Sequence, residues 1–267
     1  MGNIITFTTD FGLKDSYQGA MKGAALSINP AARLVDITHL VESGNILEGA
    51  FILLESYGFF PEGTIHLAVV DPGVGSQRKA VLVETERYCF VGPDNGLLFL
   101  AAGREKVKRV IHLTERPFFR KEISSTFHGR DIFAPVAAHL SLGTNPGAFG
   151  PEIEGLAPVE MPRPAKKDAI ITGEVIYVDT FGNLITNIKS EDLPADAGLL
   201  DVSLNGLVIK GLTSTYSSVR KGEPLALVSS AGHIEIAVNS GPASKYFNAK
   251  VGSRVALAPS KGGKRGG

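Results

Sequence analysis

Two aspartates in the first half of the chain stand where a carboxylate could bind or activate a ligand. Asp10 directly follows the apolar run Ile4–Thr9, and Asp71 directly follows Thr64–Val70, so each comes at the end of a predicted strand. Ligands of open α/β sheets bind beyond the carboxyl ends of the strands, and a glycine within two residues lets the backbone approach closely. Either aspartate alone could be a turn former. Two at one sheet edge predict a binding site.

His128 and Arg78 are the next candidates. His128 lies just before the predicted helix Asp131–Leu140, whose free N–H groups and dipole favour electron-rich ligands; a capping or packing histidine is the alternative. Arg78 belongs to a glycine-containing loop that begins at Asp71. The glycines allow this loop to fold back and pair Arg78 with Asp71, whereas a solvated loop charge is the alternative.

Several other chemistries are disfavoured by the sequence. It contains no GxSxG elbow, and Cys89 lies inside an apolar strand, so we do not expect covalent serine or cysteine catalysis. The histidines show no HExxH or comparable spacing, so we expect no metal site. Residues 73–79, GVGSQRK, lack the Gly-Lys-Ser/Thr ending of a phosphate-binding loop.

Small polar turns recur in the second half of the chain. Asp179–Asn183 carries an acid, an aromatic ring and an amide, and residues 229–232 and 239–241 form similar turns. Tyr216 lies in a loop rich in Thr and Ser, where its ring could stack on a flat ligand or cover the edge of a core. As isolated turns, these segments carry no specific chemistry.

The composition is that of a soluble globular protein in a reducing compartment. The 267 residues include 27 basic and 27 acidic side chains, a balance that argues against nucleic acid or an anionic membrane as partner. No apolar run approaches the roughly 18 residues that span a bilayer, and Asp10 comes too early for a signal peptide. The single cysteine excludes internal disulfides. The start MGNIIT matches a myristoylation pattern, but the adjoining predicted strand argues against lipidation. We therefore expect a cytoplasmic protein.

Residues 1–155 are predicted to form an α/β domain with a mainly parallel sheet, because short apolar runs alternate with helical patterns. Helical spacing covers Tyr17–Ile28, with Asp15 or Ser16 as the N-cap, and also Asn45–Tyr57. Strands are predicted at Ile4–Thr9, Leu34–Ile37, Thr64–Val70, Ala80–Glu84 and Tyr88–Val91.

The second half changes character. Prolines in residues 156–168 predict an extended linker, and residues 260–267 are predicted to be a disordered tail. Between them, residues 169–259 contain only short strand patterns, which predict a smaller all-β, barrel-like domain. The dipeptide Asn205–Gly206 is a strong hairpin signal. The predicted strands are Thr172–Asp179, Leu184–Ile188, Leu200–Leu204, Leu207–Lys210, Pro224–Ser229, Ile234–Val238 and Ser253–Ala258.

Six segments, in this order along the chain, resemble the S-adenosyl-L-methionine (SAM) hydroxide adenosyltransferases, relatives of enzymes that fluorinate or chlorinate the same substrate. The resemblance runs from residue 4 to about 258, so it is more specific than any single motif. The segments are FTTDFG (7–12), VVDPGVGSQRKA (69–80), VGPDNGLL (91–98), TFHGRDIFAP (126–135), DTFGNLITNI (179–188) and IEIAVNSGPAS (234–244).

The resemblance implies both an architecture and a reaction. The architecture is an α/β domain followed by a β-barrel, in a homotrimer whose active sites lie between neighbouring subunits. The reaction is attack of water or hydroxide on the ribose C5′ of SAM, giving adenosine and methionine without a metal or organic cofactor. The hydrolytic signature of the family falls on Asp71, Arg78 and His128. Asp71 and His128 could hold the water and take its proton, while Arg78 stabilises hydroxide or orients Asp71.

The resemblance also implies substrate-binding residues in both domains. Asp10 matches the ribose-diol carboxylate, Asp179 faces the methionine ammonium, and Asn183 contacts adenine, over which Tyr216 stacks. The full set is Asp10, Ser16, Phe127, Asp179, Asn183, Tyr216, Ser230, Glu235 and Asn239.

Three alternatives to hydrolysis are open. A halogenating enzyme is the first; in those relatives the position of Asp71 is a Tyr and the position of Arg78 is lost, while their halide-binding Ser or Gly falls at Gly129 and so does not discriminate. A binding protein without turnover is the second, although it has no need for all three polar residues. A structural domain is the third, and the many polar turns argue against it. Gly44 departs from the fluorinating relative, which has a Trp beside the substrate.

Overall fold

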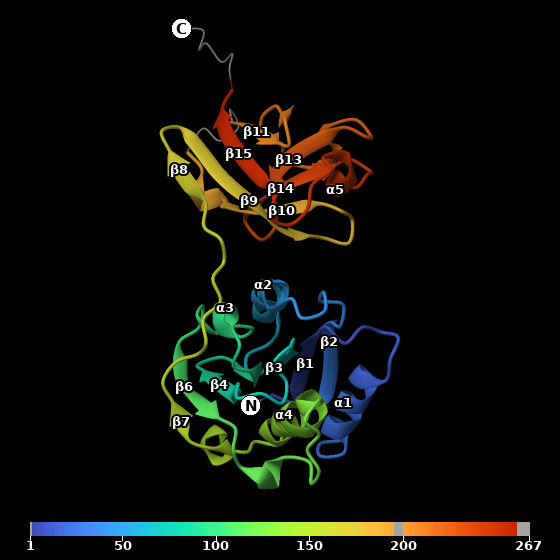
Figure 1. The fold of residues 1–267 in the computed structure, drawn as a ribbon, viewed down its shortest axis with the longest axis vertical. Coiled ribbons are helices and arrows are strands. Elements are labelled where there is room, and N and C mark those ends of the chain that lie inside the picture. Colours follow the sequence, from blue (N-terminus) through green and yellow to red (C-terminus); the bar gives the residue numbers. More distant parts are fainter. Residues whose placement is uncertain (1, 195–199, 261–267) are drawn as a thin grey trace. The chain divides into compact units, whose positions relative to one another are not determined.

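The computed structural model describes residues 2–194 and 200–260, so most of the predicted tail at 260–267 lies outside the described residues. Contacts divide the chain into two compact units, residues 1–160 and 161–267 (Figure 1). Within the described residues, none of the helices combines the length and the apolar character that crossing a membrane requires.

The first unit is built on a mixed sheet in the order β2-β1-β3-β5-β4-β6-β7. Neighbouring strands from β2 to β5 run parallel, and those from β5 to β7 run antiparallel. The sheet that was predicted to be mainly parallel is therefore mixed, with its parallel part from β2 to β5, because a tight turn at residues 86–88 makes β4 and β5 an antiparallel hairpin. The strands are β1 (Ile4–Thr9), β2 (Arg33–Thr38), β3 (Ile65–Val69), β4 (Ala80–Thr85), β5 (Cys89–Pro93), β6 (Val107–His112) and β7 (Glu152–Ile153).

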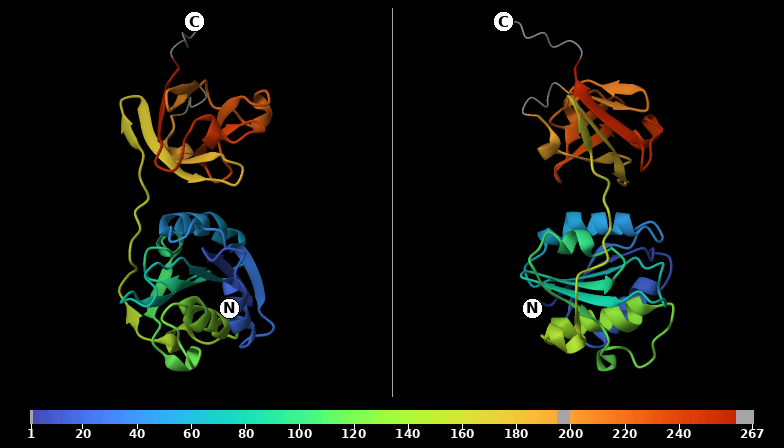
Figure 2. Two further views of the ribbon diagram at one scale, coloured as in Figure 1. Left: turned by 45° about the vertical axis from the view of Figure 1, so that its right-hand side comes forward. Right: turned by 60° about the vertical axis from the view of Figure 1, so that its left-hand side comes forward.

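Helices cover both faces of this sheet (Figure 2). One core cluster packs α1 and α4 against inward-facing residues of the strands, including Phe7 and Leu67. On the opposite face, α2 and α3 pack over strand residues that point the other way, such as Ala68 and Phe90. This alternation explains why the central strands are apolar throughout. The α-helices are α1 (Tyr17–Leu26), α2 (Ile46–Ser56), α3 (Phe99–Ala102) and α4 (Ala134–Ser141).

The helix predicted at Asp131–Leu140 has a different beginning. A π-helical turn, Gly129–Phe133, runs directly into α4, and Pro135 lies in the first turn of α4, near the start of the helix as predicted. Short 3₁₀ turns connect other elements of both units: Tyr57–Phe59, Arg116–Phe118, Pro146–Phe149, Ser190–Asp192 and Tyr216–Ser218.

The second unit is all-β apart from one short helix, α5 (Ala243–Tyr246), in its described residues. All strand pairs in its sheet are antiparallel, in the order β12-β11-β15-β9-β10-β14-β13, with β8 beside β9. The sheet curls so that the edge strands β12 and β13 approach each other around one apolar core. The strands are β8 (Ala165–Lys167), β9 (Ile170–Val178), β10 (Leu184–Lys189), β11 (Leu200–Leu204), β12 (Leu207–Ile209), β13 (Pro224–Val228), β14 (His233–Val238) and β15 (Arg254–Pro259).

Two local predictions about the second unit can be compared with the structure. The hairpin at Asn205–Gly206 is confirmed: both residues have positive φ (48° and 80°) and connect β11 to β12 in the two-residue turn that such a hairpin needs. Residues 165–167 lie in the predicted linker but form β8, because their backbone pairs with β9.

Candidate active site

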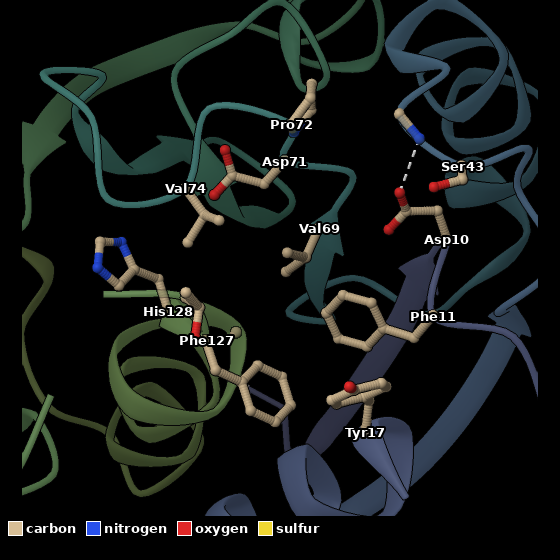
Figure 3. Close-up of a pocket in the computed structure, with 13 residues that line it drawn as sticks. Asp10, Phe11, Tyr17, Ser43, Val69, Asp71, Pro72, Val74, Phe127 and His128 are labelled. Atoms are coloured by element: carbon tan, nitrogen blue, oxygen red, sulfur yellow. Dashed lines mark hydrogen bonds between the residues drawn. The ribbon is translucent and has the colours of Figure 1, made fainter. Parts of the chain in front are cut away.

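A pocket of about 330 Å³ opens at the carboxyl ends of β1 and β3 (Figure 3). The two strands are parallel neighbours with Thr9 opposite Val69, so the aspartates that follow them lie at one sheet edge, as predicted. The pocket is lined by Asp10, Phe11, Tyr17, Ser43, Gly44, Val69, Asp71, Pro72, Val74, Thr126, Phe127, His128 and Gly129.

Asp71, Arg78 and His128 form one hydrogen-bonded group. The Arg78 Nε donates to Asp71 Oδ1 at 2.9 Å and Oδ2 at 3.0 Å, and Arg78 Nη2 also pairs with Oδ2. The same Nη2 lies 2.8 Å from His128 Nδ1. Asp71 and Arg78 are nearly buried, with 5% and 10% of their side chains exposed. Charge-assisted bonds in such a setting orient all three groups.

The contact with Arg78 determines which nitrogen of His128 carries a proton. A guanidinium can only donate, so Nδ1 must accept and the neutral ring carries its proton on Nε2. Burial, and then the positive charge of Arg78, lower the pKa of His128 below its usual value. His128 and Asp71 line the pocket, whereas Arg78 lies outside the lining and connects them.

The loop between Asp71 and Arg78 folds back through short turns. Val74 N donates to Asp71 O at 3.2 Å, Ser76 N donates to Gly73 O at 3.1 Å, and Arg78 N donates to Ser76 Oγ at 3.3 Å. This is the geometry that the glycines of the loop predict. It brings residues seven positions apart into a bidentate ion pair.

Asp10 lies across the pocket from His128 (Figure 3). Its Oδ2 accepts a hydrogen bond from Gly44 N at 2.9 Å, and Gly44 has a positive φ of 74°. The preceding residue stabilises the turn at Asp10: Thr9 Oγ1 accepts a hydrogen bond from Phe11 N at 3.2 Å and lies 2.8 Å from His39 Nδ1. Gly44 therefore contributes a backbone donor to the Asp10 carboxylate.

An aromatic wall, Phe11, Tyr17 and Phe127, closes one side of the pocket. Phe127 meets Phe11 and Tyr17 edge-to-face, with ring centroids 5.6 and 5.4 Å apart. Sequence reasoning missed Phe11 and Tyr17 as site residues, although Phe11 directly follows Asp10 and Tyr17 starts the helix after it. Ser16, which was predicted as a site residue, is the exposed N-cap position of α1, makes no capping bond and does not line the pocket.

In the second unit, Asp179 and Asn183 lock one turn. Asp179 Oδ1 accepts from Phe181 N at 2.9 Å and Asn183 N at 2.8 Å, and Oδ2 accepts from the Asn183 side chain at 2.9 Å. The turn displays Phe181, which is 79% exposed, while Asn183 is buried. The amide of Asn183 thus serves the turn itself.

Tyr216 and Glu235 form a second pair. The Tyr216 hydroxyl donates to Glu235 Oε1 at 2.7 Å, while 47% of the Tyr216 residue is exposed and Glu235 is buried. Burial raises the pKa of the Glu235 carboxyl, and the nearby charge of Asp179 raises it further. Burial and the bond to Glu235 raise the pKa of Tyr216 to about 12.

The remaining predicted residues of this unit stand apart from these pairs. Ser230 is exposed in the turn between β13 and β14. Asn239 Nδ2 donates to Val219 O at 2.8 Å, a bond that ties two loops together. Throughout residues 2–194 and 200–260, no three His, Cys, Asp or Glu side chains are grouped so that they could hold a metal ion.

Comparison with protein families matches almost the whole chain. Residues 5–150 match the SAM hydroxide adenosyltransferase N-terminal domain, and residues 173–256 match the C-terminal domain of the same family.

Individual relatives cover the chain end to end. The (R)-S-adenosyl-L-methionine hydrolase of Salinispora tropica is 38% identical over 94% of this chain and 96% of its own. A fluorinase of an Actinoplanes species is 26% identical over 95% of this chain and 97% of its own. An uncharacterized conserved protein from Thermotoga maritima has a similar crystal structure, with a TM-score of 0.89 and 38% identity over 95% of this chain and 99% of its own.

Proposed function

The chain belongs to the SAM hydroxide adenosyltransferase family, and on that premise we infer that it is an enzyme that hydrolyses S-adenosyl-L-methionine to adenosine and L-methionine. The observation that carries this assignment is the hydrogen-bonded group of Asp71, Arg78 and His128 beside the pocket. The greater identity to a SAM hydrolase than to a fluorinase, 38% against 26%, supports water rather than halide as the nucleophile.

This reaction needs no general acid, but it does need a nucleophile held in position. The sulfonium is already an activated leaving group, so methionine departs with the electron pair of the C5′–S bond and needs no proton. The oxygen of water forms the new bond to C5′ and gives up one proton. Holding the water in line with the C5′–S bond is therefore the main catalytic task.

We assign a separate role to each member of the group. Asp71, whose carboxylate lines the pocket, accepts the proton of the attacking water. His128, neutral with its proton on Nε2, orients that water by donating a hydrogen bond. Arg78 orients both side chains from outside the pocket lining and keeps the ring of His128 in this tautomer.

The binding roles are divided between the two units. We propose that Asp10 binds the ribose hydroxyls. The aromatic wall, and Phe127 in particular, contacts the substrate. In the second unit, Asp179 supplies negative charge for the ammonium, and the exposed ring of Tyr216 stacks on adenine, held by Glu235. Ser16, Asn183, Ser230 and Asn239 complete the proposed set. SAM is the substrate, and no further cofactor is proposed.

We propose that the protein is a cytoplasmic homotrimer in which the second unit of one subunit completes the pocket of the next. Co-expressing Asp71→Ala, which removes the proposed base, with Asp179→Ala, which weakens substrate binding, tests this arrangement at a SAM concentration well below the KM of the second variant. If each site combines two subunits, mixed trimers regain a fraction of activity, since some sites receive two intact halves. Mixed trimers no more active than the sum of the two parent variants would contradict shared sites.

The name of the hydrolase relatives specifies the (R) configuration at sulfur, and we propose the same preference for this chain. Inversion at sulfur exchanges the directions of the methyl group and the methionine chain, so one pocket cannot place C5′ equally well for both forms. Separate assays with the two sulfur epimers measure the preference; equal kcat/KM for both would contradict it.

The activity itself is tested by incubating purified protein with SAM in halide-free buffer and following adenosine and methionine by chromatography. Equal amounts of the two products are expected, with a strong loss in Asp71→Asn. Product formation that requires added chloride or fluoride would instead indicate a halogenating enzyme, and tight binding without products would indicate a binding protein.

A further inference from the structure

Two loops supply the groups that hydrolysis needs, and they touch at two places. The first loop runs from Asp71 to Arg78, and the second, here called the His128 segment, is Ser124–His128. Arg78 Nη2 meets His128 Nδ1 at 2.8 Å. Three residues earlier in each loop, the backbone of Gly75 lies against the backbone of Ser125.

The approach at Gly75 is too close for any side chain. A Cβ atom on Gly75 would lie 2.4 Å from Ser125 O and 3.4 Å from Ser125 C, and both are backbone atoms. Gly75 also has a φ of +77°, which other residues adopt only with strain. Glycine is therefore required here both by conformation and by the neighbouring loop.

The His128 segment is held from its other side by Asp131. Asp131 is fully buried, and its Oδ2 accepts from Ser124 N at 2.9 Å. The Arg130 guanidinium binds the same carboxylate at 2.7 and 2.9 Å and lies over the Phe127 ring, 4.9 Å from its centroid. Because Asp131 binds the start of the His128 segment, the segment cannot move freely away from a side chain added at Gly75.

From these contacts we propose that Gly75 is a positioning residue for hydrolysis: its backbone contact with Ser125 sets the separation of the two loops at which Arg78 reaches His128. Adding a side chain at Gly75 displaces the His128 segment or the Asp71–Arg78 loop by the overlap that the added Cβ creates. Displacements of about 1 Å at a catalytic group can cost about a hundredfold in rate. This inference rests on the proposed function, because it concerns the geometry of that reaction.

The experiment compares Gly75→Ala with Gly143→Ala. Gly143 also has a positive φ, +90°, but a Cβ there would have no heavy atom of the described residues within 4 Å. Both variants carry the backbone strain of alanine at positive φ, and only Gly75→Ala carries the collision. We expect kcat to fall at least about tenfold in Gly75→Ala, with a small change in KM, and to stay within about twofold of wild type in Gly143→Ala.

A second background separates positioning from general damage. In His128→Ala there is no ring left to position, so adding Gly75→Ala should lower kcat by a smaller factor than it does in the wild-type background. A kcat for Gly75→Ala equal to that of the Gly143→Ala control, or the same fold-loss with and without His128, would overturn the proposal.

A substrate-free measurement makes the proposal independent of turnover. The ¹⁵N shifts of the His128 ring report its tautomer and its pKa in the free protein. Gly75→Ala should raise that pKa, because the positive charge of Arg78 moves away, and weaken the preference for a proton on Nε2. An unchanged His128 titration would overturn the proposal. If wild type fails to cleave SAM while this shift is observed, the proposed function fails and the positioning contact stands.

Discussion

The two units carry their polar site residues in different ways. In the first unit, Asp71, Arg78 and His128 bind one another in a single chain of contacts at the edge of a pocket. In the second, Asp179 with Asn183 and Tyr216 with Glu235 form separate pairs, and each pair presents an exposed aromatic ring. The contrast fits the proposed roles, in which the catalytic groups all lie in the first unit and the second unit contributes to substrate binding alone.

Removing Arg78 should have the largest effect. Arg78→Ala leaves the nearly buried Asp71 carboxylate without its cation and frees the His128 ring, so kcat/KM should fall about a thousandfold, measured as adenosine release. Arg87→Ala is the control, since Arg87 also binds a carboxylate with its Nε and Nη2, that of Glu105 at 3.1 and 2.6 Å, away from the pocket. Similar kcat/KM losses in both variants would remove the special role of Arg78.

Acid should affect the stability of the two units with opposite sign. His66, fully buried in the first unit, has its pKa lowered by burial to about 3, so below pH 6.5 the unfolded chain binds a proton that the folded chain does not. Between pH 6.5 and 3, this residue makes stability fall on acidification by about 1.4 kcal/mol per pH unit. Glu235 has a raised pKa, so protonation of its carboxyl favours the folded state. This stabilising contribution is full below pH 4.5 and is lost as pH rises through the pKa of the folded state.

Thermal unfolding at several pH values measures these contributions. His66→Phe keeps an aromatic ring and should flatten the dependence on pH below 6.5 relative to wild type. Glu235→Gln should remove the opposite contribution from the second unit. A variant His66→Phe with the same pH dependence as wild type would contradict the burial of a neutral His66.

The charge of Asp179 should affect substrate binding more than turnover. Asp179→Asn keeps an acceptor oxygen for the turn but removes the negative charge, so KM should rise about tenfold with kcat within about threefold of wild type. Asp201→Asn, which breaks the pair with Lys210 in the same unit, is the control. A loss confined to kcat would place Asp179 in the chemistry and break the division between the units.

The smallest effect is expected at the Tyr216 hydroxyl. Tyr216→Phe keeps the ring but loses its bond to Glu235, so KM should rise about twofold to fivefold. Tyr216→Ala, which removes the ring as well, should raise KM further. Equal KM values for Tyr216→Phe and Tyr216→Ala would show that the ring contributes nothing beyond its hydroxyl.

Local signals in the sequence predicted many of the contacts between residues that are close together along the chain. The Asp71–Arg78 pair follows from glycines in one short loop, and the hairpin at Asn205–Gly206 follows from two residues that accept positive φ. The strand β6 was missed, because its pairing with β4 joins distant segments and is decided by the whole core rather than by a local pattern. The antiparallel pairing of β4 with β5 was not predicted either, although the tight turn that causes it is local.

The site shows the same limit. The aromatic wall gathers Phe11, Tyr17 and Phe127 from two distant segments, and its contacts exist only in the folded chain. Gly75 stands in a motif that the sequence identified, yet its role depends on Ser125, which no local pattern links to it. Ser16 was predicted from the family resemblance, and the fold places it at a helix start outside the pocket lining.

The central claim is that the first unit directs water to the ribose C5′ of SAM. Hydrolysis in ¹⁸O-water with halide-free buffer, followed by mass spectrometry of the products, tests it directly. The account predicts adenosine that carries one ¹⁸O at the 5′ position and methionine that carries none. Adenosine without the label, or a substrate that stays intact until halide is added, would contradict it.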